Sequence, residues 1–431
     1  MTAGAPVQPA RQPAVQPAVL PAVLPSGARI YERCGVLGRL SEDSDGLTRI
    51  FLSKEQRAAN ELALGWMREA GMSARLDAIG NAVGRYEGRS PGAPCLMLGS
   101  HLDTVRNAGR YDGMMGVVAA IECVHALNAR GTRLPFAIEV VGFADEEGVR
   151  FGSTLLGSRA VAGDFDSKLL DARDSDGISM REALVAFGLD PDRIGDAARH
   201  RKDLLAYAEL HIEQGPVLES EGLPVGVVTA INGANRFLVE IQGMAGHAGT
   251  VPMSLRRDAL AAASECILAI EARCGREPEL VGTVGKVEAG PGATNVIPGL
   301  ARFTIDLRAP SDDQRRRATA DVEQAIRSIC ARRNVQVDIK PTHEGKTAAC
   351  AEWLQAQIGS AIEAEGIEAR RLPSGAGHDG MALVDLVDIG MLFVRCKAGI
   401  SHNPLEAITV ADAELSARVF LRFIEQFKPL S

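Results

Sequence analysis

The chain has 431 residues, which at about 100–200 residues per domain allows two to four domains with a large core and excludes a mini-protein. The 47 Lys and Arg against 55 Asp and Glu give a net charge of −8 without a basic block, so we expect no nucleic-acid or membrane partner. Hydrophobic residues at 46% and charged residues at 24% are typical of a globular protein.

The N-terminal segment, residues 1–29, is rich in Pro, Ala, Gln and Val. Prolines at this density are incompatible with a helix, so we predict a disordered tail. A proline-rich ligand for a partner domain is the alternative. The segment lacks the pattern of a signal peptide, no run is long enough to span a membrane, and the eight scattered cysteines indicate reduced thiols. We therefore expect a cytoplasmic protein.

From about residue 30 onward, helical and strand patterns alternate. Residues 55–70 carry apolar residues at helical spacing, and residues 95–100 and 136–144 are short apolar runs typical of buried strands. A helix is predicted between these two runs, over residues 116–128. This succession predicts an α/β catalytic domain with a mostly parallel central sheet flanked by helices, and with its site at the carboxyl ends of the strands.

A different pattern begins near Asn235. Strand, helix, strand, strand, helix and strand patterns follow one another over residues 236–243, 255–274, 280–290, 301–308, 311–332 and 335–340. This order predicts a compact two-layer α+β unit. Because the first pattern resumes after it, we expect the unit to be inserted. The predicted domains are a catalytic domain in two parts, 30–233 and 346–431, and an inserted domain, 234–345.

Polar side chains follow the predicted strands. His101 and Asp103 come just past the first strand and point to the same side of an extended chain, so Asp103 could orient a metal-bound His101. Asp112 lies in a Tyr-Asp-Gly turn. The acidic run 145–147 follows the next strand, and its carboxylates repel one another unless they are solvated or neutralised by a cation.

Imidazoles enter from two further segments. His211 and Gln214 lie in ELHIEQGP, and His402 lies in GISHNP. Alone, the acidic run indicates a solvated loop. Imidazoles and carboxylates from four separated strand ends are, however, what a carboxylate-bridged site for two metal ions requires. The combination predicts metal binding.

The motifs GSHLDTV, YDG, FADEEGVRF, HIEQGP, GMAGHAGTVPM, GATNVIPG, DLR, SGAGHDG and GISHNP resemble, in this order, those of the hydantoinase/carbamoylase family of metal-dependent amidases. The resemblance runs from about residue 30 to the end and implies two divalent ions, zinc or manganese, with nickel or cobalt as alternatives. It implies that Glu146 is the catalytic base and that Asp112 bridges the ions. The implied ligand set is His101, Asp112 and His211 for one ion and Asp112, Glu147 and His402 for the other.

The resemblance also implies that the inserted unit is a lid and a dimerisation domain of a homodimer. On this unit, Arg308 would bind a substrate carboxylate, Asn295 would add a hydrogen bond, and His247 would stabilise an oxyanion from the other subunit. Gln214 would contact the substrate, and His378 would be a second oxyanion-stabilising histidine. Without the resemblance, an ion-paired arginine, a turn asparagine and two loop histidines remain the alternatives.

These observations predict a hydrolase of a linear amide bond in a ureido compound that carries a carboxylate. Residues 39–72 resemble allantoate amidohydrolases more closely than N-carbamoyl-L-amino acid hydrolases, so allantoate is the predicted substrate. The alternatives are an N-carbamoyl-L-amino acid hydrolase or β-ureidopropionase, a dipeptidase, and a binding protein that has lost catalysis. The presence of the base and of the whole ligand set argues against the last.

Overall fold

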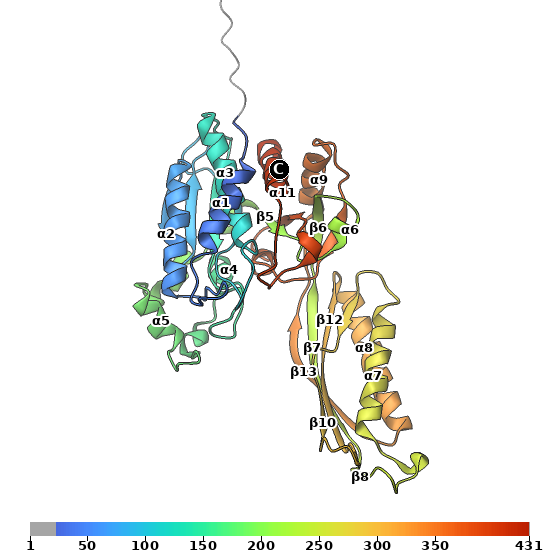
Figure 1. Ribbon diagram of the computed structural model, residues 1–431. Coiled ribbons are helices and arrows are strands. Elements are labelled where there is room, and N and C mark those ends of the chain that lie inside the picture. Colours follow the sequence, from blue (N-terminus) through green and yellow to red (C-terminus); the bar gives the residue numbers. More distant parts are fainter. Residues whose placement is uncertain (1–22, 431) are drawn as a thin grey trace, which may run out of the picture.

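The computed structural model describes residues 23–430, which form two units, each built on its own sheet (Figure 1). In the main unit, a nine-stranded sheet has the order β1-β2-β4-β3-β5-β16-β6-β14, with β15 paired to β6. Its strands are β1 (Ser73–Leu76), β2 (Ala82–Tyr86), β3 (Cys95–His101), β4 (Ala137–Phe143), β5 (Leu204–Ile212), β6 (Val225–Ile231), β14 (Ala348–Ala349), β15 (Arg371–Ser374) and β16 (Ile389–Val394).

The central strands β4, β3, β5 and β16 run parallel to one another, while β1 and β2 on one side and β6 and β14 on the other pair antiparallel. The expected α/β fold with a mostly parallel central sheet is thus confirmed. Because the central strands are parallel, their carboxyl ends meet at one edge of the sheet. Side chains that follow these strands are therefore brought together.

Helices cover both faces of the main sheet. One face packs against α1 (Gly27–Leu37), α2 (Lys54–Glu69), α3 (Met114–Ala129), α9 (Glu352–Glu363) and α11 (Val410–Gln426). The other face packs against α4 (Leu156–Ala162), α10 (Gly380–Leu383) and the segment that carries α5 (Met180–Ala186). Shorter elements complete the unit: α6 (Val217–Ser220), η1 (Ser167–Asp171), η2 (Pro191–Ala197), η3 (Arg201–Asp203) and η5 (Lys397–Gly399).

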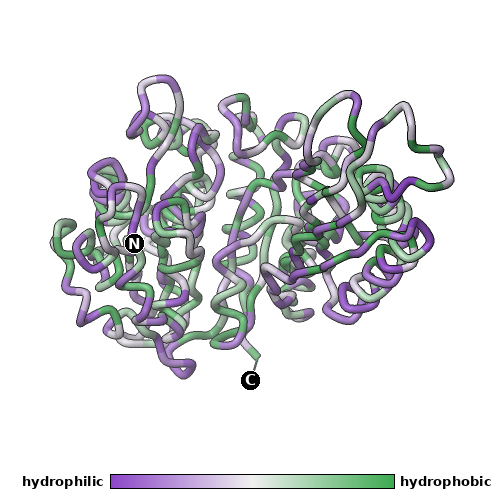
Figure 2. Tube along the Cα trace, turned by 90° about the horizontal axis from the view of Figure 1, so that it is seen from below, coloured by the Kyte–Doolittle hydropathy of each residue, from purple (hydrophilic) through white to green (hydrophobic). Residues whose placement is uncertain are grey.

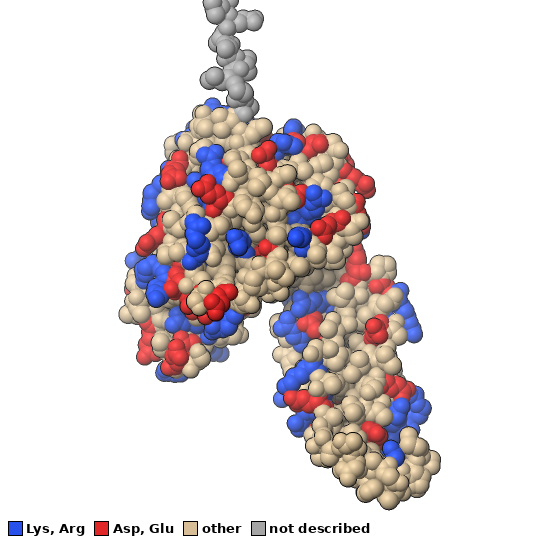
Figure 3. Space-filling view, in the orientation of Figure 1, with Lys and Arg blue, Asp and Glu red and all other residues tan. Residues whose placement is uncertain are grey.

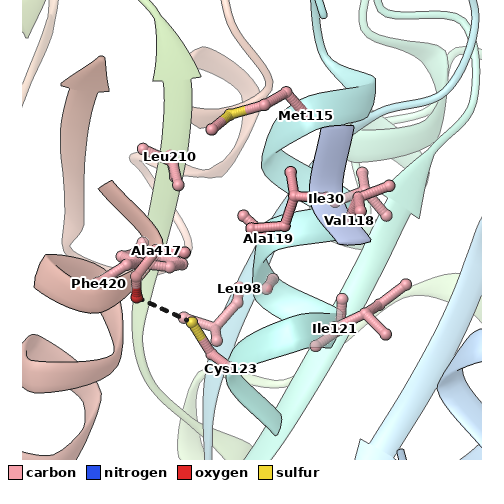
Figure 4. Packing of buried hydrophobic residues seen from close by; sticks show 14 of the residues in the cluster. Ile30, Leu98, Met115, Val118, Ala119, Ile121, Cys123, Leu210, Ala417 and Phe420 are labelled. Atoms are coloured by element: carbon pink, nitrogen blue, oxygen red, sulfur yellow. Dashed lines mark hydrogen bonds between the residues drawn. The ribbon is translucent and has the colours of Figure 1, made fainter. Parts of the chain in front are cut away.

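Strand β3 is buried along its whole length, because its side chains alternate between the two covered faces. Leu98 points into the cluster that includes Met115 of α3 and Phe420 of α11 (Figure 4). In the same cluster, the thiol of Cys123 donates to the carbonyl oxygen of Ala417 at 3.4 Å. This packing holds the strand whose end carries the first predicted ligand.

The N-terminal boundary differs from the prediction. Residues 1–22 of the predicted tail, 1–29, lie outside the described residues. Residues 27–29 belong to helix α1. This helix begins at Gly27, because the side chain of Ser26 accepts from a backbone N–H three residues later at 3.3 Å. The backbone N–H of Ser26 also donates to the buried carboxylate of Glu122 at 3.1 Å.

In the second unit, a five-stranded sheet has the order β10-β12-β7-β13, with β9 paired to β12, and β8 and β11 form a separate ribbon. Helices α7 and α8 pack on one face of the sheet. Figure 3 shows a hollow between the two units. The elements are β7 (Gly233–Gln242), β8 (Gly246–His247), η4 (Met253–Leu255), α7 (Ala259–Cys274), β9 (Val281–Thr283), β10 (Val287–Gly290), β11 (Val296–Ile297), β12 (Leu300–Ala309), α8 (Asp312–Arg332) and β13 (Gln336–Gly345).

The single strand predicted over residues 280–290 is wrong, because two short strands, β9 and β10, occupy this range. Both pair with β12, but the backbone N–H of Lys286 between them donates to the hydroxyl of Thr304 at 3.2 Å instead of to a backbone carbonyl. The helix predicted from residue 255 begins later, at Ala259. There, the carboxylate of Asp258 accepts from a backbone N–H of the first turn.

Hydropathy and charge are distributed as in a protein with buried sheets. Hydrophobic residues predominate along the inner strands and polar residues along much of the periphery (Figure 2). On the face shown in Figure 3, positive and negative side chains are interspersed over both units. Within residues 23–430, no helix has the length and apolar sequence needed to cross a membrane.

Candidate metal centre

The predicted ligands converge at one edge of the main sheet. His101 is the last residue of β3, Asp112 lies in the turn before α3, and Glu147 follows β4. His211 lies in β5, and His402 follows η5, downstream of β16. The first three-residue group, His101, Asp112 and His211, and the second, Asp112, Glu147 and His402, each place their ligand atoms within 4.8 Å of one another. The predicted ligand residues are therefore adjacent in space.

Asp112 lies between the two groups. Its Oδ1 is 3.5 Å from Nε2 of His101 and 3.1 Å from Nε2 of His211. Its Oδ2 is 3.1 Å from Nε2 of His402, and Oε1 of Glu147 is 3.5 Å from the same nitrogen. One carboxylate thus faces two separate donor sets, as a ligand that bridges two cations must.

The electrostatics keep Asp112 ionised. Burial alone would raise the pKa of Asp112, but hydrogen bonds with His101, His211 and His402 hold it well below its ordinary value. Burial alone would likewise lower the pKa of His211, but Asp112 raises it above the ordinary value. The donor set of imidazoles and carboxylates fits a divalent cation such as zinc or manganese, because these are the ligand types that such ions bind.

The turn that carries Asp112 is held by two residues. Gly113 has φ +67°, and a Cβ at this position would lie 2.5 Å from ring atoms of His101, so only glycine fits. The buried Oε1 of Glu406 accepts from two backbone N–H groups of the turn, at 2.7 and 3.1 Å, and its Oε2 accepts from the hydroxyl of Ser401 at 3.0 Å. No motif in the sequence points to Glu406.

Asp103 acts differently from the prediction. Nδ1 of His101 is 3.0 Å from the backbone carbonyl oxygen of Asp103 and 3.8 Å from its carboxylate. The carboxylate accepts from the backbone N–H groups of Glu146 and Glu147, each at 3.1 Å, because these donors are nearer. The main chain of Asp103 therefore orients His101, and its side chain holds the two glutamates.

Glu146 is buried beside the ligands and belongs to neither of the two donor sets around Asp112. With His101 and Glu147 it forms a further group whose ligand atoms lie within 4.8 Å of one another. Burial raises the pKa of Glu146 well above its ordinary value; His101 opposes this shift, and the carboxylates of Glu147 and Asp379 add to it. Burial also raises the pKa of Glu147, to about 7. A carboxylate with a raised pKa beside a metal site can accept a proton near neutral pH.

His378 lies next to His211, one of the predicted metal ligands. It is 1% exposed, and the centroid of its ring is 4.4 Å from that of His211. Its Nε2 is 2.7 Å from Oγ of Ser374. Burial lowers the pKa of His378 well below its ordinary value, and His211 adds to this effect, so the imidazole is neutral. The same loop reaches the predicted base, because a Cβ on Gly377 would lie 3.7 Å from Oε1 of Glu146.

Glu209 is a buried carboxylate that the prediction does not include. It is fully buried and accepts from the hydroxyls of Ser100 at 2.8 Å and Tyr207 at 2.9 Å. With His211 and His378 it forms another group of ligand atoms within 4.8 Å of one another. The sequence holds a signal for it, because Glu209 and His211 are two residues apart on a strand and share one face.

The predicted substrate residues lie in three places. Gln214 is at the centre, where its Nε2 donates to Oδ2 of Asp112 at 2.9 Å. Arg308, on β12 of the second unit, donates from Nη1 to the carbonyl oxygen of Gly375 at 2.7 Å, in the loop that carries His378. His247 and Asn295 are exposed and adjacent, because residue 247 lies on β8 and residue 295 immediately precedes its partner β11. This ribbon lies at the end of the second unit that is remote from the main unit (Figure 1).

Residues 97–426 match the sequence profile of peptidase family M20/M25/M40. The chain is 42% identical to an N-carbamoyl-L-amino acid amidohydrolase of Geobacillus stearothermophilus, over 93% of this chain and 98% of that relative. It is 39% identical to allantoate deiminase 1 of Glycine max, over 92% of this chain and 88% of that relative. A solved hydantoinase/carbamoylase family amidase of Burkholderia multivorans superposes with a TM-score of 0.89 at 32% identity, covering 95% of this chain and 100% of the other.

Proposed function

Because the chain belongs to peptidase family M20/M25/M40 and to its hydantoinase/carbamoylase amidases, we propose that it cleaves the ureido group of a small molecule that also carries a carboxylate. The chain is a hydrolase of carbon–nitrogen bonds in linear amides. The proposal of a ureido carboxylate substrate is supported mainly by the two donor sets that meet at Asp112. Glu146 lies beside these sets, and Arg308 contacts the adjacent loop. We assign the metal ligands and the catalytic base to a domain formed by residues 30–233 and 346–431, and Arg308, Asn295 and His247 to a lid and dimerisation domain, 234–345.

In this proposal the first donor set and the second would each hold one divalent ion, zinc or manganese, and Asp112 would be shared between them. When bound, such ions lower the pKa of a coordinated water towards neutrality and polarise the carbonyl group under attack. Glu406 accepts from the backbone N–H of Asp112, and the hydroxyl of Ser401 donates to Oδ2 of Asp112 at 3.1 Å, so both keep this carboxylate in place. Asp103 keeps the backbone of both glutamates at the site.

Glu146 moves the proton in this reaction. Its carboxylate takes a proton from the water that attacks the carbamoyl carbon and delivers it to the leaving nitrogen. Hydrolysis of the ureido group then yields the amine, ammonia and carbon dioxide. His378, a neutral imidazole beneath the ligands, and His247, from a partner subunit, would stabilise the developing oxyanion, and Gln214 would contact the substrate.

For Arg308→Lys, we expect kcat/KM for ureido carboxylates to fall at least about 10-fold, because one ammonium group cannot replace a planar, two-pronged donor. Steady-state kinetics of the metal-loaded enzyme would measure this change. Arg302→Lys, on the same strand but paired with Glu240, is a matched control and should behave like the wild type. Normal kinetics for Arg308→Lys would mean that the carboxylate is read elsewhere.

We further propose that the protein is a homodimer in which His247 and Asn295 complete the partner's site. Both residues are exposed, at the end of the second unit remote from the ligands. Met253 and Leu255 nearby are 78% and 72% exposed, and this tip is mostly uncharged in Figure 3. Exposed apolar side chains of this kind favour a protein contact.

Mixed dimers test this arrangement. Homodimers of Glu146→Gln and of His247→Ala should each be nearly inactive, whereas a mixed dimer regains one of its two sites. Random reassortment makes about half of the dimers mixed, so activity should recover to about a quarter of the wild-type value. The measurement is turnover after the variants are unfolded and refolded together, with exchange verified by mass. Exchange without recovery would place His247 in its own subunit's site or outside catalysis.

The substrate itself is decided by comparing turnover on the metal-loaded protein. We propose allantoate first, and N-carbamoyl-L-amino acids as the second candidate because the relative that is 42% identical carries that name. The experiment compares kcat/KM for allantoate, N-carbamoyl-L-amino acids, β-ureidopropionate and a dipeptide. A higher value for allantoate supports the first candidate, and a higher value for an N-carbamoyl-L-amino acid supports the second. Preference for the dipeptide would contradict both.

A further inference from the structure

Arg308 is held by a carboxylate on its own strand. Its Nε donates to Oδ1 of Asp306 at 2.8 Å, and its Nη2 donates to Oδ2 at 3.1 Å. The two residues are two positions apart on β12, so their side chains share the face of the sheet that α7 and α8 leave uncovered, while Leu307 between them is buried in the core. The pair is therefore a planar, two-pronged contact on the open face of the second unit.

Asp306 is also bound from the other side. Arg236, opposite it on β7, donates from Nε to Oδ2 of Asp306 at 2.9 Å. Burial alone would raise the pKa of Asp306, but the hydrogen bonds and charges of Arg308 and Arg236 hold it below its ordinary value. The carboxylate is thus ionised and fixed, which makes it a rigid support for the guanidinium of Arg308.

The contacts of Arg308 with Asp306 and Gly375 leave two of its N–H donors available for a further acceptor. A guanidinium group has five N–H donors. Asp306 takes the one on Nε and one on Nη2, and the carbonyl oxygen of Gly375 takes one on Nη1. One N–H on each of the two Nη atoms remains. These donors belong to a side chain that borders a cavity of about 630 Å³ between the sheet face and Gly375.

We propose that Asp306 is a positioning residue of the carboxylate subsite: it locks the guanidinium of Arg308 so that its two remaining N–H groups meet the two oxygens of the substrate carboxylate. This inference rests on the proposed function. Asp306 itself does not touch the substrate. It restricts the rotation of a long side chain before the substrate arrives, so that less conformational entropy is lost on binding.

A double-mutant cycle tests the proposal. Asp306→Asn keeps the shape but replaces one acceptor oxygen by a donor. We expect it to raise KM for the ureido carboxylate at least about 10-fold, with kcat changed by less than about 3-fold, because an oriented, charge-assisted contact is lost in binding. Because Asp306 acts only through Arg308, Asp306→Asn with Arg308→Lys should be no worse than Arg308→Lys alone. Asp306→Ser, which removes both carboxylate oxygens and the negative charge, is a second variant with the same expected pattern.

Glu240→Gln is the matched control, because Glu240 forms an ion pair with Arg302 at 2.6 Å on the same sheet but does not contact Arg308. Its KM should equal the wild-type value. Two results would overturn only the positioning role of Asp306. One is a loss of kcat/KM in the double variant equal to the product of the two single losses. The other is a normal KM in both Asp306 variants while Arg308→Lys is impaired. Normal kinetics for Arg308→Lys would overturn the proposed carboxylate contact and this inference with it.

Discussion

Glu146→Gln should retain its metal and lose at least about 10²-fold in kcat, the scale of a general base. The amide has nearly the same shape as the carboxylate but cannot accept the proton. The buried side chain groups with His101 and Glu147 and belongs to neither donor set around Asp112, so we expect both sets to stay intact. The measurements are steady-state turnover and elemental analysis on the same preparation.

Glu147→Gln is the control for this assignment. Glu147 lies in the donor set with Asp112 and His402, so its replacement should weaken metal binding as well as turnover. If Glu146→Gln lost metal while Glu147→Gln kept two ions per chain, the two roles would be exchanged.

Asp112→Ala should lose both metal ions, and its turnover should fall to the uncatalysed rate measured without enzyme. Its two carboxylate oxygens face different donor sets, so a single replacement removes a ligand from each. His402→Ala is the comparison, because His402 contacts only one side of Asp112 and its loss should leave about one ion per chain. Elemental analysis after dialysis measures both. Two ions bound to Asp112→Ala would contradict the bridging role.

Much of the fold follows from local sequence patterns. The alternation of apolar strands with helices predicts the parallel centre of the main sheet, because crossover connections demand it. Sequence patterns do not predict where an element begins or ends when this depends on contacts with distant residues. Helix α1 begins within the segment predicted to be disordered, where the backbone N–H of Ser26 donates to the buried Glu122, which is far away in sequence. The split between β9 and β10 coincides with a one-residue change of register against β12, since Thr283 pairs with Asp306 but Val287 pairs with Phe303.

The residues of the site likewise include some that sequence motifs predict and others that they do not. His101, Asp112 and His211 lie in motifs whose composition indicates metal binding, and the structure places them together. Glu406 supports Asp112 from a segment without a recognisable pattern, because a long-range contact between a side chain and the backbone leaves no periodic signal. The role of Asp103 was equally hidden, since spacing shows which side chains share a face but not which backbone donors lie nearer.

We propose that this chain cleaves a ureido group in a reaction that needs bound metal. The most direct measurement is ammonia release from allantoate and from N-carbamoyl-L-amino acids by one preparation, assayed after chelation and again after addition of zinc or manganese. We expect no release from the metal-free protein and restored release when about two ions per chain are bound. Full activity of metal-free protein, or no release from any ureido carboxylate with both ions bound, would contradict it.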